Sequence, residues 1–217
     1  MPRTREIGRD DAHPRAQQLY KLLFGERDPI EDPGTETGTP GNWWTVTAAV
    51  PDMFDHIVDG FSFYRSANRV LDPQLRELGQ TRTGYARGSQ FVFSQHCKAC
   101  RSVGLSEAKI EAIAHWSASD VYSRIERAVL AYTDCLVLEG GRVPDGVFDA
   151  LRDGLSEEAI LELTYIVCTY DMHATMTKAL RMEFDDVEDR IVEVPAPTST
   201  EEEAGVDAMA VVDQATE

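Results

Sequence analysis

Apolar residues recur at steps of three and four positions along most of the chain between Pro14 and Met182, and this spacing restricts the possible folds more than any other feature. It places apolar side chains on one face of an α-helix. Runs of alternating β-branched residues, which would indicate strands, are nearly absent from the same stretch. The sequence therefore predicts an all-α protein.

Capping and turn residues predict where the helices begin and end. Asp72 followed by Pro73 is typical of a helix start, because the Asp side chain can accept first-turn amides and proline fits the first helical position. Ser106 and Ser156, each followed by glutamate, repeat this start signal. The predicted helices cover residues 14–24, 51–69, 73–87, 89–103, 106–116, 120–139, 144–153 and 156–182.

Two segments fall outside the helical pattern. Residues 25–42 contain three prolines interspersed with glycines, which predicts a long loop that covers a site, packs on a partner subunit or is simply mobile. Residues 195–217 hold six acidic residues and no Lys, Arg or aromatic residue, which is typical of a disordered tail. We therefore expect an N-terminal segment 1–42 with one helix and the Pro/Gly-rich loop, a helical domain over 43–194, and an acidic tail.

The chain is strongly acidic, with a formal net charge of −17. Nucleic acids and anionic membrane surfaces carry phosphates that a basic surface must neutralise, so neither is an expected partner. No apolar run approaches the roughly 18–20 residues of a membrane span, and the first ten residues lack the apolar core of a signal peptide. We therefore expect a cytoplasmic protein.

The densest group of chemically reactive side chains lies at Ser94–Arg101, which contains His96, Cys97 and Cys100. The C-x-x-C spacing is that of a dithiol redox pair, although Cys97 falls well inside a predicted helix, where the helix dipole no longer lowers a thiol pKa. We expect no metal, because structural zinc needs four ligands and the sequence has no second pair at ligand spacing. His96 could instead act as general acid and base, or be a polar residue of the core.

A wider pattern around this segment resembles the carboxymuconolactone decarboxylase family, which is related to the alkylhydroperoxidase D proteins. The matching residues are Leu71-Asp72-Pro73, Arg76-Glu77-Leu78, Arg82, Gln95-His96 and Gly104-Leu105-Ser106-Glu107, and the likeness extends over approximately residues 43–185. It implies an all-helical alkylhydroperoxidase D-like bundle assembled as trimers or hexamers. It also implies a pocket beside a glutamate and a histidine, which correspond to Glu77 and His96.

The sequence departs from the peroxidase branch of that family at the redox pair. There, a glutamate is followed by eleven residues, C-x-x-C, three residues and a histidine. Counting back from His96 places Glu77 at the glutamate, but Ser89 and Val92 at the two cysteine positions. The C-x-x-C of this chain follows the histidine, so the resemblance gives it no redox role. Cys100 could line the same pocket as His96, or both cysteines are small core residues.

Other side chains are candidates for the substrate site. Arg82 matches a family position and could bind the substrate or pair with Glu77 merely to fix helix packing. Arg87 and Arg101 flank the motif, so each could hold a carboxylate or simply be exposed. His173, on the last predicted helix, could reach the cavity as a second acid–base group or face solvent. The pair Trp43-Trp44 follows the long loop and could form an apolar wall of the site or a subunit contact.

The resemblance implies a decarboxylase-like lyase without organic cofactor, acting on a small carboxylated or lactone-type metabolite of aromatic or related catabolism. His96 would transfer the proton, with Glu77 as its partner. Two alternatives stay open: a thiol-dependent, peroxiredoxin-like peroxidase that uses Cys97 and Cys100, and a non-catalytic oligomeric binding protein. The net charge of −17 also restricts how the protein could bind a charged substrate. An anionic substrate needs a local basic patch from the arginines named above; otherwise the substrate is neutral.

Overall fold

Helices form the fold, as the apolar spacing predicts. The computed structural model describes residues 1–64, 66–183 and 191, and no strand occurs among them. The α-helices are α1 (Pro14–Phe24), α2 (Asn42–Thr47), α3 (Pro51–Tyr64), α4 (Pro73–Ala86), α5 (Gln90–Ser102), α6 (Glu107–Ala112), α7 (Arg124–Val137), α8 (Asp145–Arg152) and α9 (Glu157–Leu180), with a 3-10 helix, η1 (Ile113–Ala118), after α6. The predicted tail over 195–217 lies outside the described residues.

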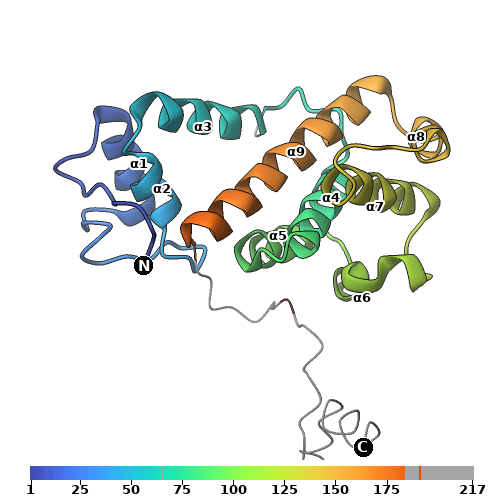
Figure 1. The fold of residues 1–217 in the computed structure, drawn as a ribbon, viewed down its shortest axis with the longest axis horizontal. Helices are drawn as coiled ribbons and strands as arrows, with labels where there is room; N and C mark the ends of the chain where they lie inside the picture. Colours follow the sequence, from blue (N-terminus) through green and yellow to red (C-terminus); the bar gives the residue numbers. More distant parts are fainter. Residues whose placement is uncertain (65, 184–190, 192–217) are drawn as a thin grey trace, which may run out of the picture.

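Helix α9 is central to the arrangement. Figure 1 shows α1, α2 and α3 on one side of α9, and α4, α5 and α7 on the other. The main apolar core lies on the second side, where Leu163 and Val167 of α9 are fully buried against residues of α4, α7 and α8. None of the helices in the described part of the chain is both long and apolar enough to cross a membrane.

Two of the three predicted start signals are side-chain caps in the structure. The Asp72 side chain accepts two first-turn amides of α4, and Ser156 accepts one of α9. Ser106 stands at the N-cap position of α6 without a side-chain cap bond. Helix α7 begins later than predicted because Ser123 and Glu126 form a reciprocal capping box, which fixes the first turn there.

Shorter helices account for the remaining differences from the predicted boundaries. Helix α2 was not predicted; it follows Gly41, whose φ of 82° is left-handed. The predicted helix 51–69 ends at Tyr64. The predicted helix 106–116 divides into α6 and η1, and His115 inside η1 is non-helical with φ −128° and ψ 35°. Segments of six residues contain too few repeats of the apolar spacing to be recognised.

The N-terminal segment packs on the remaining helices. One apolar cluster joins α1 to α2 and α3, and a second joins Trp43 of α2 to α3 and to the C-terminal end of α9. The segment 25–42 is irregular, as predicted, and reaches α5. There Gln95 and Lys98 donate hydrogen bonds to the Thr37 carbonyl at 3.2 and 2.7 Å. This loop is therefore fixed to the helix that carries His96.

We expect Gly84→Ala to lower the free energy of unfolding by about 1–3 kcal/mol, because the backbone of α5 lies directly against α4 at this glycine. A Cβ at Gly84 would lie 2.5 Å from the Phe93 backbone nitrogen. Gly60→Ala is the matched control, since a Cβ at this glycine of α3 meets nothing within 4 Å. Urea unfolding should show about 0.4–1 kcal/mol of stabilisation for Gly60→Ala. Equal effects of the two substitutions would contradict the close approach.

Candidate active site

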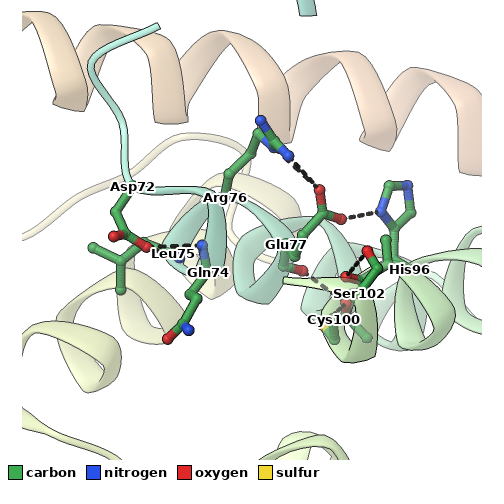
Figure 2. A network of polar contacts seen from close by, with 10 residues as sticks. Asp72, Gln74, Leu75, Arg76, Glu77, His96, Cys100 and Ser102 are labelled. Atoms are coloured by element: carbon green, nitrogen blue, oxygen red, sulfur yellow. Dashed lines mark hydrogen bonds and ion pairs between the residues drawn. The ribbon is translucent and has the colours of Figure 1, made fainter. Parts of the chain in front are cut away.

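Glu77 of α4 and His96 of α5 form a buried hydrogen-bonded pair (Figure 2). His96 Nδ1 lies 2.7 Å from Glu77 Oε2. Glu77 Oε1 accepts two bonds from the Arg76 guanidinium, at 2.9 and 3.1 Å. The Glu77 and His96 side chains are only 2% and 8% exposed. The structure thus brings together the two residues that the sequence proposed as a catalytic pair.

The surroundings of Glu77 keep its carboxyl group ionised. Burial is the largest influence and raises the pKa of Glu77, but the bond and charge of His96, together with those of Arg76, outweigh it and hold the pKa below its ordinary value of 4.5. A carboxylate can only accept hydrogen bonds, so the shared proton resides on His96 Nδ1. Nε2 of His96 bonds to no other described residue. This nitrogen is therefore the one available for proton transfer.

A cavity of about 350 Å³ lies beside His96. Its apolar wall comes from α1, α2, α3, α5 and α9, and the loop 25–42 covers one side. The aromatic lining consists of Trp43, Trp44, Phe61, Phe91 and Tyr170, and the loop contributes Thr35, Glu36, Thr37 and Thr39. The loop thus lines a cavity, as expected of the first of the three roles considered for it.

His173 of α9 lines the same cavity and is surrounded by aromatic rings. Its ring centroid lies 4.5 Å from that of Trp43, 5.1 Å from Tyr170 and 5.5 Å from Phe61. Tyr170 also makes an edge contact with His96 at 4.4 Å. His173 is 5% exposed, so it faces the cavity and not solvent. Burial, with a further contribution from His96, lowers the pKa of His173 to about 4, and this imidazole is neutral at physiological pH.

Apart from its two histidines, the described wall of the cavity has acidic side chains and no basic ones. Glu36 and Glu183 belong to the lining, and no Lys or Arg of the described chain does. Glu183 accepts a hydrogen bond from the Trp43 backbone N–H at 2.5 Å. This bond holds the Glu183 side chain in the cavity wall. Among the described residues, no group of three or more His, Cys, Asp or Glu is arranged to hold a metal ion. An anionic ligand would therefore meet negative charge without a compensating Lys or Arg from the described wall.

The arginines proposed for substrate binding do not line this cavity. Arg82 is buried, and its guanidinium donates to Asp134 at 2.6 and 3.0 Å and to a backbone carbonyl at 3.0 Å. Arg87 and Arg101 are partly exposed and form ion pairs. Arg87 pairs with Asp171, and Arg101 pairs with Glu107. Each guanidinium thus binds a carboxylate of the chain itself, and these three arginines form no basic patch at the cavity.

The predicted redox pair lies in the apolar core. Cys97 and Cys100 are fully buried in a cluster with residues of α4, α6 and α7, and neither belongs to the cavity lining. Cys100 Sγ lies 3.1 Å from Thr81 Oγ1. Burial raises the pKa of Cys100 to about 12, so its reactive thiolate form is disfavoured. Cys97 and Cys100 form no disulfide with each other.

We expect the exposed Cys168 to be the thiol that reacts rapidly with Ellman's reagent in the folded protein, because the other three cysteines are buried. Counting thiols before and after denaturation measures this directly. The Cys168→Ser variant is the control and should lose almost all rapid labelling. If that folded variant lost two thiols on exposure to peroxide, the buried pair would be redox active, contrary to this expectation.

Several residues of the cavity were not found by sequence reasoning. Tyr170 precedes His173 by three residues on one helix, so the helical spacing could have identified it. Phe61 and Phe91 lie on other helices and carry no signal that distinguishes them from core residues. The threonines of the loop are equally ordinary in sequence. They lie at the site where α5 donates hydrogen bonds to the loop at Thr37.

An all-helical fold with a buried Glu–His pair between consecutive helices defines an alkylhydroperoxidase D-like protein, as the sequence predicted. Residues 52–134 match the model of the carboxymuconolactone decarboxylase family, and the chain belongs to this family. The uncharacterized protein YdfG of Bacillus subtilis is 30% identical over 98 residues, which cover 45% of this chain and 67% of YdfG.

Solved structures share the fold. A putative antioxidant defence protein AhpD from Agrobacterium tumefaciens is 27% identical, with a TM-score of 0.56 over 67% of this chain and 94% of that protein. A variant of the debrominase Bmp8, solved in complex with 2,3,4-tribromopyrrole, is 18% identical, with a TM-score of 0.64 over 83% of this chain and 90% of Bmp8. Assembly of this chain into trimers or hexamers stays a prediction.

Proposed function

We propose that the protein is a thiol-independent acid–base enzyme that moves a proton on a small, uncharged, cyclic carbonyl compound of the lactone type. His96 Nε2 takes and returns the proton, and Glu77 fixes the imidazole in the required tautomer. The observation that carries this proposal is the buried 2.7 Å contact between His96 and Glu77 in the wall of a cavity of about 350 Å³. Proton transfer by an imidazole needs no thiol.

The charges of the lining support one of the two substrate classes that the resemblance implied. A decarboxylase acts on a carboxylate, and this group would enter beside Glu36 and Glu183 without a Lys or Arg from the described lining. A lactone carries no charge and is compatible with an aromatic wall. We therefore favour a lactone, and a lyase reaction on a carboxylated metabolite is the less supported form of this proposal.

The proposal is tested by hydrogen exchange in D₂O. The probe is α-angelica lactone, a neutral five-membered lactone, and proton NMR measures the loss of its C3–H signal. We expect the wild-type protein to accelerate the exchange and His96→Ala to lose about 10²–10⁴-fold of that acceleration. His115→Ala, at an exposed histidine, is the matched control and should retain it. Equal rates for wild type and His96→Ala would contradict the assigned role.

The choice of an uncharged substrate has its own measurement. Methyl paraconate and paraconic acid share one lactone ring and differ only in whether a second group is an ester or a carboxylate. We expect the ester to inhibit the exchange more strongly than the acid, because the acid meets the two glutamates of the lining. Stronger inhibition by the acid would favour the decarboxylase form.

A further inference from the structure

The cavity contains a second buried histidine whose surroundings differ from those of His96. His96 bonds to the Glu77 carboxylate, whereas His173 contacts the aromatic rings of Trp43, Phe61 and Tyr170. His173 forms no ion pair with an acid in the described chain. Two imidazoles that share a cavity are therefore placed in opposite electrostatic environments, one beside an anion and one in an apolar box.

Such a difference assigns different chemistry to the two rings. A histidine beside a carboxylate is stabilised when it takes up a proton, and so suits the role of base. A histidine that stays neutral keeps one N–H and can donate it to an oxygen on which negative charge develops. The other titratable groups that line the cavity are Tyr170, Glu36 and Glu183, and none of them is a cation that would take over this task.

Trp43 offers a second donor at the same end of the cavity. Its indole Nε1 is buried and has no hydrogen-bond partner among the described residues, although the ring lines the cavity and packs on His173. A buried N–H without an acceptor is destabilising, so an acceptor is expected in the functional state. A carbonyl oxygen of a ligand near His173 would be such an acceptor.

We infer that His173 is the electrophilic group of the active site and donates its imidazole N–H to the carbonyl oxygen of the bound lactone, while His96 Nε2 removes a proton from the adjacent carbon. This inference rests on the proposed function. The C–H bond breaks and an N–H bond forms at Nε2. The C–H electron pair becomes the C=C bond of an enolate, and the carbonyl π pair moves to oxygen.

The reaction is then completed by the same groups. His96 returns the proton to the same carbon or to the far end of a conjugated system, which gives exchange or isomerisation without any oxidant or reductant. His173 stabilises the oxyanion in the interval and stays neutral. The substrate class thus narrows to lactones with an acidic hydrogen next to the carbonyl carbon or conjugated with it.

Two variants of His173 separate donation from packing. His173→Phe keeps a flat ring in the aromatic box but has no N–H, whereas His173→Gln retains a neutral N–H donor. We expect His173→Phe to lower kcat for α-angelica lactone exchange by about 10²–10³-fold, as loss of an oxyanion donor does. His173→Gln should recover at least part of this loss, with KM little changed in both. Circular dichroism melting confirms that each variant is folded.

A measurement on a bound ligand separates this inference from the proposed function. The probe is γ-butyrolactone labelled with ¹³C at its carbonyl, and infrared spectroscopy reports hydrogen bonding as a lowered carbonyl stretch. We expect the stretch to be lowered fully in wild type, His96→Ala and His173→Gln, but less in His173→Phe, where only the Trp43 indole N–H can still donate. An identical stretch in wild type and His173→Phe would overturn the inference and leave the role of His96 intact. The expected stretches without any proton exchange would support donation by His173 and contradict the proposed function.

Discussion

Replacing Glu77 with alanine is expected to lower the free energy of unfolding by about 3–5 kcal/mol, because it removes a buried carboxylate from the partners arranged around it. His96 and Arg76 both donate to this carboxylate, and the Glu77 side chain is 2% exposed. Urea unfolding at neutral pH measures the loss. Glu107→Ala is the matched control, since Glu107 forms an ion pair at the surface and should contribute no more than about 1 kcal/mol.

The stability that is lost in Glu77→Ala should become smaller as the pH falls. The pKa of Glu77 is lowered in the folded state, so the ionised carboxylate stabilises the fold at pH values above its ordinary 4.5. This contribution is lost as the pH falls through the lowered pKa of the folded protein. The difference between wild type and Glu77→Ala should therefore be largest near neutral pH and shrink below about pH 4.5. A difference that grows towards acid pH would contradict an ionised Glu77.

Glu77→Gln is expected to separate stability from proton transfer. Glutamine has the same shape, but its amide can present an N–H to the imidazole and so select the opposite tautomer. Exchange of α-angelica lactone should fall by about 10²–10⁴-fold, while the fold is less affected than in Glu77→Ala. A purely structural pairing of Glu77 and His96 would leave the exchange rate of the folded variant unchanged.

How far the sequence predicts this protein depends on whether a feature is local. Helices α4 and α9 are predictable because Asp72 and Ser156 form caps with residues next to them in the chain. The contact between Glu77 and His96 is nearly local as well, since it joins consecutive helices. Its position could be expected from the spacing of the two residues and from the family resemblance.

Features that depend on distant residues could not be predicted in this way. The cavity wall combines Thr37, Phe61 and His173, which come from a loop and two helices far apart in the sequence. The arginine partners illustrate the same limit, because Arg82 and Asp134 meet only through the packing of α4 against α7. Sequence spacing shows that an arginine is present, but not whether a carboxylate of the chain already binds it.

Replacing Arg82 with leucine is expected to lower the free energy of unfolding by about 3–5 kcal/mol, because it leaves the partly buried Asp134 carboxylate without its counter-ion. Trp116 Nε1 also donates to Asp134, at 2.9 Å, but carries no charge. Arg152→Leu is the matched control, since Arg152 pairs with an acid at the exposed surface. Its effect should stay within about 1 kcal/mol.

A double variant decides between a structural and a substrate-binding role for Arg82. If the ion pair only fixes α4 against α7, Arg82→Leu combined with Asp134→Leu should be more stable than Arg82→Leu alone, because the isolated charge is removed. Exchange of α-angelica lactone by folded molecules should be unchanged in the single and the double variant. Suppose instead that Arg82→Leu left stability intact and weakened inhibition by paraconic acid tenfold. Arg82 would then bind a substrate carboxylate, and the preference for an uncharged lactone would be wrong.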